Sequence, residues 1–206
     1  GLLIFHGVVS YGLLLKATTG LNPGILRTKM RRVWAFAFST ASSGATLPIT
    51  LRTVEKRLGV PKSVAGFAIP LGATVNMDGT AIMQGVATVF IAQVYGIELS
   101  AMQLLMVILT ATLASIGTAA VPGVGLITLS LVLTQAGLPV EGVALIIGVD
   151  RLLDMIRTAV NVTGDATVAT IVAHREGQLD ETIYNDPHAD SDMGSEAAAA
   201  ESSEVS

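Results

Sequence analysis

The chain has 206 residues, of which 51% are hydrophobic and 14% are charged, and its mean hydropathy is +0.65. These values are typical of an integral membrane protein and argue against a soluble domain. The net charge of -4 says little about the apolar part, because nine of the 16 acidic residues lie beyond residue 175. The absence of Cys and the scatter of the three His residues exclude a disulfide framework, a cysteine nucleophile and a His/Cys zinc site.

The first segments predict the end of a transmembrane helix followed by a broken hairpin. Residues 1–20 begin in an apolar run without an initiator Met or a signal-peptide pattern, so we expect the last part of a helix whose start is missing. Residues 21–60 contain two apolar arms, interrupted by a Ser- and Gly-rich stretch, with Pro48 at the tip. Neither arm has the roughly 20 residues of a full crossing, which predicts a re-entrant hairpin.

Residues 61–97 predict a long transmembrane helix that is interrupted in the middle. The interruption is 76–80 (Asn-Met-Asp-Gly-Thr), where a Gly and polar side chains that compete for backbone hydrogen bonds weaken a continuous helix. Residues 98–138 predict a second re-entrant hairpin, because a Gly- and Pro-rich link separates two short apolar arms. Residues 139–173 predict the last transmembrane helix.

The two halves of the chain share one order of elements: a hairpin, then a helix that carries an acid. Lys and Arg flank the first hairpin, whereas the second has only acids at its bases, so the hairpins should enter from the cytoplasm and from outside, respectively. The predicted fold class is an all-α membrane protein, an inverted repeat of two re-entrant helical hairpins and two long transmembrane helices, one of them unwound. Residues 174–206 are expected to be a disordered, acidic cytoplasmic tail.

Five polar residues of the last helix fall on one narrow stripe of its surface: Asp154, Arg157, Thr158, Asn161 and Asp165. A charge at the bilayer centre costs about 2.5 to 3.5 kcal/mol, so the stripe needs partners or ligands. A structural Asp154–Arg157 ion pair is one interpretation, but a binding site explains all five residues. The Arg fork suits a carboxylate and the Asp suits an ammonium group, which together predict a site for an acidic amino acid.

The interrupted helix and the hairpin tips predict further ligand contacts. An unwound backbone frees carbonyl oxygens, and Asn76 and Asp78 add side-chain oxygens, which indicates a sodium site; a simple helix kink is the alternative. The tips, residues 42–44 and 117–123, would direct backbone N–H groups toward an anionic substrate. Gly-rich stretches also serve close helix packing, which is the alternative for the tips.

Four motifs in this order resemble the glutamate/aspartate members of the dicarboxylate/amino acid:cation symporter family: Ser42-Ser43-Gly44-Ala45-Thr46-Leu47-Pro48, Asn76-Met77-Asp78-Gly79-Thr80, Ser115-Ile116-Gly117-Thr118, and the stretch from Asp154 to Asp165. The resemblance covers about residues 1–173. It implies an elevator transporter whose mobile domain holds the substrate between two hairpin tips. This chain would be a C-terminal fragment that supplies most of that domain, and a homotrimer would form through an N-terminal scaffold that it lacks.

The resemblance also implies the site residues. Arg157 would hold the substrate's side-chain carboxylate and Asp154 its α-amino group, within a substrate cage of Ser43, Thr80, Gly123, Asp154, Arg157, Thr158 and Asn161. Sodium ions, with no other cofactor, would bind to Gly72, Asn76, Asn161 and Asp165, to Thr74, Met77, Ser115, Ile116 and Thr118, and to a third site shared by Asn76 and Asp78. Some members carry a second Arg where this chain has Ala41 and Met155; Arg151 is a candidate replacement, or else a boundary Arg that reaches to the interface.

The predicted function is sodium-coupled uptake of acidic amino acids by a multi-pass protein of the cell membrane, in contact with lipid. A sodium- or proton-coupled C4-dicarboxylate symporter is the alternative on the same fold, and a channel or a membrane scaffold is the alternative from other classes. We do not expect an enzyme, because the sequence has no phosphate-binding loop, nucleophile elbow or zinc-ligand pair. We also expect no nucleic-acid partner.

Overall fold

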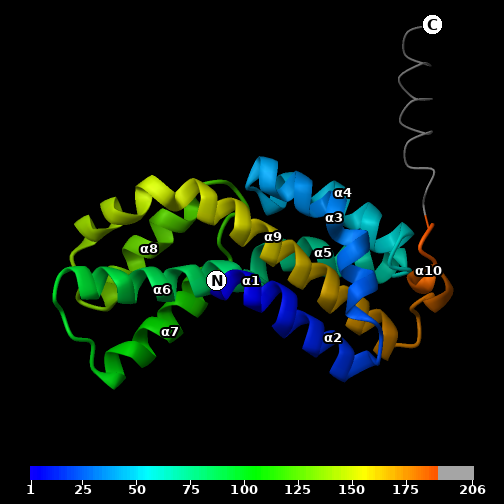
Figure 1. Ribbon diagram of the computed structural model, residues 1–206, viewed down its shortest axis with the longest axis horizontal. Coiled ribbons are helices and arrows are strands. Elements are labelled where there is room, and N and C mark those ends of the chain that lie inside the picture. Colours follow the sequence, from blue (N-terminus) through cyan, green and yellow to red (C-terminus); the bar gives the residue numbers. More distant parts are fainter. Residues whose placement is uncertain (190–206) are drawn as a thin grey trace, which may run out of the picture.

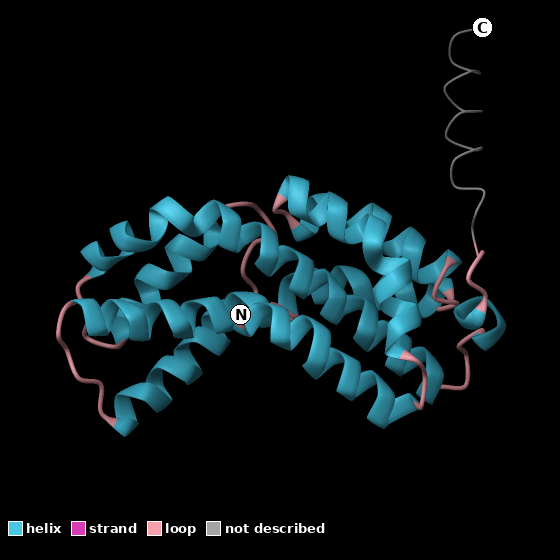
Figure 2. Ribbon diagram, viewed as in Figure 1, coloured by secondary structure: helices cyan, strands magenta, loops and turns pink. Residues whose placement is uncertain are grey.

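The structure, a computed structural model, describes residues 1–189. Within these residues every regular element is a helix, as Figure 2 shows, which confirms the all-α class. Figure 1 shows an elongated molecule with two lobes, one on each side of the N-terminus, and the long helix α9 (Ala144–Arg175) runs through both. The arrangement of the lobes therefore depends on one continuous helix.

The first lobe begins with an apolar helical segment and a tight hairpin. Helix α1 (Leu2–Phe5), a π-helical turn η1 (His6–Ser10) and α2 (Tyr11–Thr19) follow one another directly. Together they form the one described helix that is long and apolar enough to cross a membrane. Helices α3 (Pro23–Thr40) and α4 (Ser43–Lys56) form the first hairpin, with a two-residue turn.

Local sequence explains the ends of these helices. Asn22 caps α3 by accepting a hydrogen bond from the N–H of Gly24, and Pro23 occupies the first helical position, where no N–H is needed. Ser42 caps α4 by accepting from the N–H of Ala45. We predicted Pro48 at the tip of the hairpin, and this prediction is wrong: Pro48 lies inside α4. The helix begins earlier because its N-cap, Ser42, precedes Pro48 by six residues.

The interrupted helix links the two lobes: α5 (Lys62–Val75) packs in the first lobe and α6 (Asp78–Val94) in the second. Its break consists of Asn76 and Met77, whose backbone angles are not helical. Helices α7 (Ala101–Ser115) and α8 (Val124–Gln135) form the second hairpin, whose link spans residues 116–123. A short 3₁₀ turn, η2 (Val140–Val143), leads into α9, and α10 (Glu181–Asn185) follows it.

Each lobe has its own apolar core, and α9 contributes to both. The first core lies among α3, α4, α5 and the C-terminal half of α9, and includes Met30, Val54, Ile69, Ala166 and Tyr184. The second lies among α6, α7, α8 and the start of α9, and includes Ile91, Val107, Leu129, Leu133 and Ile146. Since polar residues fill the middle of α9, the two cores meet at a polar junction.

Both hairpins end in the same local structure. Gly59-Val60-Pro61 follows α4, and Gly137-Leu138-Pro139 follows α8. Both glycines have a positive φ, +74° and +72°, a conformation that is strained for residues with a Cβ. The matching turns support a structural repeat and give two equivalent positions, one at the base of each hairpin.

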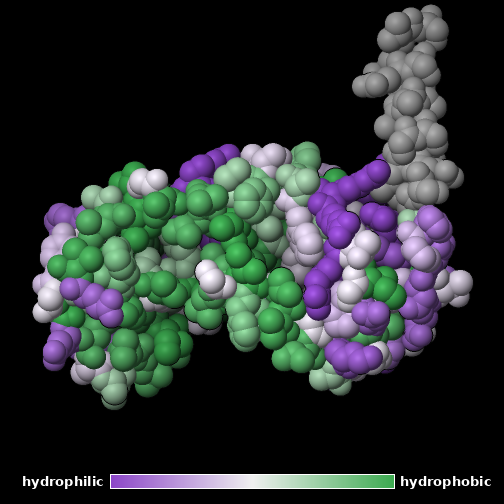
Figure 3. Space-filling view, in the orientation of Figure 1, coloured by the Kyte–Doolittle hydropathy of each residue, from purple (hydrophilic) through white to green (hydrophobic). Residues whose placement is uncertain are grey.

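The face of the molecule seen in Figure 3 is apolar over most of its length. Figure 3 shows hydrophobic residues over the second lobe and the middle of the molecule, with hydrophilic residues gathered near α10. The second hairpin exposes several large apolar side chains, among them Met102, Ile108, Leu113 and Ile127. Exposed apolar patches of this extent are unfavourable in water and suit contact with lipid or protein.

The disorder that we expected from residue 174 onward is wrong for residues 174–189. Helix α9 continues to Arg175, and the chain then folds back so that Tyr184 of α10 is fully buried in the first core. Asp180 caps α10 by accepting from the N–H groups of Thr182 and Ile183. Composition did not indicate this ordered segment, because its order depends on two individual residues, the cap Asp180 and the buried Tyr184. Residues 190–206, the rest of the predicted tail, lie outside the described residues.

Candidate functional site

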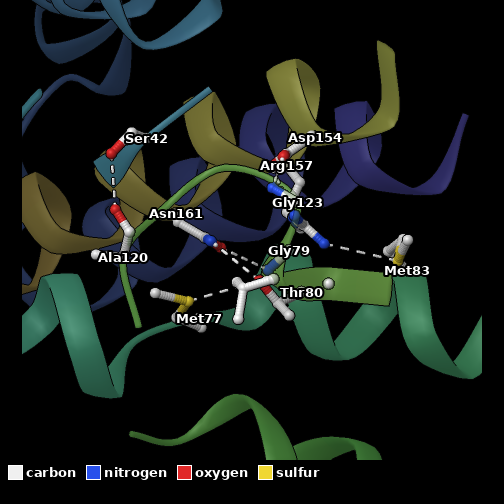
Figure 4. A network of polar contacts seen from close by, with 12 residues as sticks. Ser42, Met77, Gly79, Thr80, Met83, Ala120, Gly123, Asp154, Arg157 and Asn161 are labelled. Atoms are coloured by element: carbon white, nitrogen blue, oxygen red, sulfur yellow. Dashed lines mark hydrogen bonds and ion pairs between the residues drawn. The ribbon is translucent and has the colours of Figure 1, made fainter. Parts of the chain in front are cut away.

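A buried ion pair lies where α9 meets the tip of the second hairpin. The Arg157 Nη2 donates to Asp154 Oδ1 at 2.6 Å, and both side chains are almost completely buried. The other oxygen of Asp154 accepts from the backbone N–H of Gly123 at 2.8 Å. Figure 4 shows these three residues together above the start of α6. The pairing that sequence allowed as a structural feature is therefore present, and it includes the second hairpin tip.

Asn161, one turn further along α9, binds the interrupted helix. Its Oδ1 accepts from the N–H of Gly79 at 2.8 Å, and its Nδ2 donates to Thr80 Oγ1 at 3.3 Å. The Thr80 hydroxyl contacts Met77 Sδ at 3.6 Å. The first N–H groups of α6 have no partner within their own helix, so Asn161 satisfies one of them. This contact places the α6 start beside the ion pair.

Three residues that the sequence interpretation missed shape the space around Arg157. A Cβ on Gly125 would overlap the Arg157 guanidinium, and a Cβ on Gly79 would lie 2.9 Å from the backbone oxygen of Arg157. Met83 Sδ lies 3.8 Å from Arg157 Nη1. The glycines give a weak sequence signal because they resemble packing glycines, and Met83 gives none.

The two hairpin tips touch each other. Ser42 Oγ donates to the backbone oxygen of Ala120 at 2.7 Å, and the N–H of Gly44 donates to the same oxygen at 3.1 Å (Figure 4 shows the Ser42 contact). Ser43, one of the predicted substrate residues, lies between Ser42 and Gly44 in the sequence and is buried. Thr158 follows Arg157 in the sequence and is buried as well. All seven predicted substrate residues therefore belong to the junction of α9, the α6 start and the two tips.

Part of the first predicted sodium site comes together around Asp165. Asn76 Nδ2 donates to Asp165 Oδ1 at 3.0 Å. Gly72 lies against the same carboxylate, because a Cβ on Gly72 would overlap Asp165 Oδ1. The Asn161 side chain is engaged with Gly79 and Thr80, so its backbone oxygen is the group that would remain for a cation.

The second predicted sodium site joins the end of α5 to the end of α7. The N–H of Gly117 donates to the backbone oxygen of Thr74 at 2.7 Å, which brings Thr74 beside residues 115–118. Ser115 and Thr118 are buried, while the Ile116 side chain is about half exposed. Met77 lies in the adjacent break, with its sulfur directed to Thr80. Carbonyl and hydroxyl oxygens dominate this set, as a hard monovalent cation requires.

The third predicted sodium site is divided. The Asn76 side chain binds Asp165, whereas Asp78 Oδ2 accepts from Tyr11 Oη at 2.8 Å and lies 3.2 Å from His6 Nε2. The π-helical turn that begins at His6 immediately precedes Tyr11. Sequence reasoning missed both partners of Asp78, because they lie about 70 positions away in a segment predicted only as apolar.

Two charged residues flank the junction. Asp150 is buried, and its Oδ1 has no hydrogen-bond partner among the described residues. Arg151 is exposed, and its Nη2 reaches the backbone oxygen of Ser39 in α3 at 3.4 Å. Arg151 therefore bridges α9 and the first hairpin close to its tip, rather than pointing away from the protein.

Comparison with known proteins identifies the family. Residues 1–175 match the model of the sodium:dicarboxylate symporter family. An excitatory amino acid transporter of Caenorhabditis elegans is 52% identical over 172 residues, which are 84% of this chain and 34% of that protein. Human excitatory amino acid transporter 2 is 48% identical over 172 residues, 84% of this chain and 30% of that protein. The chain thus spans about a third of the length of these relatives, and it belongs to the sodium:dicarboxylate symporter family.

Proposed function

We propose that this chain forms the substrate-binding part of a sodium-coupled symporter for acidic amino acids. The observation that carries the proposal is the buried Asp154–Arg157 pair beneath the N–H of Gly123. Each partner is complementary to one end of an amino acid: Arg157 to a carboxylate and Asp154 to an ammonium group. An acidic amino acid can therefore replace the internal pair without leaving either buried charge unpaired, which would cost about 3–5 kcal/mol.

Sodium coupling is supported by oxygen-bearing groups on the elements that carry this pair. Asp165 of α9 binds Asn76 in the α5–α6 break, and the Thr74–Gly117 contact joins the end of α5 to the second hairpin tip. Asn161 connects substrate binding to sodium binding, because it lies between Arg157 and Asp165 on α9 and accepts a hydrogen bond from the start of α6. A cation that orders the break would thereby order the substrate residues, which is the physical basis of coupling.

Further parts of the proposal concern the whole protein. The basic residues around the first hairpin support a cytoplasmic location for its base and for the C-terminal segment, in a multi-pass protein of the cell membrane. The relatives' larger size supports a scaffold outside this chain, through which a homotrimer would form and against which this domain would move as an elevator. Our proposal includes no enzymatic activity, because the polar groups of the junction suit binding rather than bond cleavage.

The central test is sodium-dependent uptake of radiolabelled aspartate by the full-length protein in proteoliposomes. Asp154→Asn should abolish aspartate uptake, and Arg157→Ala should abolish uptake of all acidic substrates. If Asp154→Asn protein transports aspartate as well as wild type, the pair is structural and the ammonium-binding role is wrong. Thermal unfolding of each variant separates a lost site from a lost fold.

Competition and ion replacement test the alternatives. Asp154 has no obvious role for C4-dicarboxylates, so succinate should compete poorly with aspartate; strong competition would favour a dicarboxylate carrier. Uptake that persists when choline replaces sodium would favour proton coupling. A channel or a scaffold would show no saturable, substrate-dependent exchange.

A further inference from the structure

The segment that follows α9 is fastened to the base of the first hairpin through a buried lysine. Lys29 of α3 is 2% exposed, although it is charged and long. Its Nζ donates to three backbone oxygens, those of Arg57 at 2.6 Å and of Ile183 and Tyr184 at 2.7 Å each. An ammonium group has three donors, so this arrangement satisfies all of them and makes burial of the charge tolerable.

These three oxygens belong to two helix ends. Arg57 terminates α4, while Ile183 and Tyr184 lie in the last turn of α10. Terminal carbonyl groups of a helix lack partners in their own helix and attract cations. Lys29 therefore fastens α3, α4 and α10 to one another at a single point.

Two more contacts support the same attachment. Tyr184 is fully buried, and its hydroxyl donates to the backbone oxygen of Asn22 at 2.9 Å. Burial raises the pKa of Tyr184 to about 12, so this hydroxyl keeps its proton at physiological pH. The N–H of Asp180 donates to the oxygen of Gly59 at 2.9 Å. The segment thus contacts the start of α3, the end of α4 and the turn that follows it.

We propose that residues 176–186 form a clasp that holds the base of the first hairpin closed, with Lys29 as its fastening. Because α9 continues into this segment, the clasp also ties the hairpin to the helix that carries Asp154 and Arg157. The clasp restrains separation of α3 from α4 at their base and makes the first hairpin move together with α9. At the matching glycine of the second hairpin's base no such segment is in contact, since a Cβ on Gly137 meets nothing within 4 Å, although the next side chain, Leu138, is buried in the second core.

Cysteine labelling in the full-length protein, with any other cysteines replaced, tests the clasp. Val60→Cys places a thiol next to Gly59, where the wild-type side chain is 2% exposed, and Leu138→Cys places one at the matching position of the second hairpin. Lys29→Met and a truncation after Arg175 should raise the maleimide labelling rate of Cys at position 60 at least about tenfold, since charge-assisted hydrogen bonds are lost and the open population controls labelling. Labelling at position 138 should not change.

Matched controls isolate the fastening. Lys16 is exposed and donates to one carbonyl oxygen, so Lys16→Met should leave labelling at position 60 at the wild-type rate. A truncation after Ala189 keeps the clasp and should behave in the same way. Unchanged labelling at position 60 in both Lys29→Met and the truncation after Arg175 would overturn the proposal. A parallel rise at position 138 would also overturn it, because the loss would then be global.

Only the predicted effect of the clasp on transport rests on the proposed function. Labelling of the purified protein needs neither substrate nor sodium, so a failure of the clasp and a failure of the proposed transport activity give separate results. If both stand, Lys29→Met should lower the initial rate of aspartate uptake while leaving the apparent affinity for aspartate unchanged.

Discussion

The two hairpins have the same topology but are held in different ways. The first has a two-residue tip, a core shared with α5 and α9, and a base covered by residues 176–186. The second has an eight-residue link at its tip, with two positive-φ glycines, and many exposed apolar side chains. A short, covered turn restricts the backbone, whereas a longer link with two glycines leaves it more conformational freedom. The repeat therefore brings together one hairpin with a short tip and a covered base and one hairpin with a longer, Gly-containing tip.

The largest expected effect concerns the second hairpin's contact with the ion pair. Gly125→Ala places a Cβ where the Arg157 guanidinium lies, so the guanidinium must move and the affinity for aspartate should fall about 10- to 150-fold. Gly44→Ala at the first tip brings a Cβ only to 3.0 Å from the Ala120 oxygen and should have a smaller effect. Equilibrium binding of aspartate to the two purified variants measures the difference; equal losses would contradict the distinct role of Gly125.

A second comparison uses the matching glycines at the two bases. Alanine at either position costs about 1–2 kcal/mol because φ is positive. Gly59→Ala adds an overlap with the backbone oxygen of Asp180, whereas Gly137→Ala meets open space. Thermal unfolding should therefore show a clearly larger fall in Tm for Gly59→Ala. Equal shifts in Tm would mean that the segment around Asp180 moves away from the added Cβ without loss of stability.

A moderate effect is expected where the N-terminal helix supports Asp78. Tyr11→Phe removes a 2.8 Å hydrogen bond to a partly exposed carboxylate, so the sodium concentration for half-maximal uptake should rise about three- to tenfold. The KM for aspartate at saturating sodium should stay constant. Tyr95→Phe, at the exposed end of α6, is the control. A change in aspartate KM alone would show that Tyr11 serves the substrate site instead.

The smallest effect concerns the attachment of the first hairpin to α9. Trp34 Nε1 donates to Thr163 Oγ1 at 2.8 Å, and Trp34→Phe should lower the free energy of unfolding by about 1 kcal/mol. Phe36→Leu changes an exposed aromatic residue on the same helix and should leave stability unchanged. Chemical denaturation in detergent compares the two. A larger loss for Phe36→Leu would indicate that α3 is held through its outer face.

Sequence reasoning anticipated the order of elements better than their contacts. The break at Asn76 and Met77 follows from local chemistry, and so does the polar stripe of α9, because helical periodicity aligns its residues whatever surrounds them. The partners of Asp78 and the room that Gly125 leaves for Arg157 did not follow. They depend on which helices lie against one another, and a single sequence carries no direct record of such contacts.

The sequence by itself determined the membrane class, the two broken hairpins, the family and the residues of the stripe, since hydropathy, helix periodicity and local motifs are properties of neighbouring residues. Only the tertiary structure decided that Asp154 and Arg157 bind each other beneath Gly123, that Asn76 and Asp78 turn to different partners, and that an acidic segment expected to be disordered covers the first hairpin. These outcomes depend on buried polar groups finding partners far away in the chain, because an unsatisfied charge or N–H inside the protein costs more than local preference can offset.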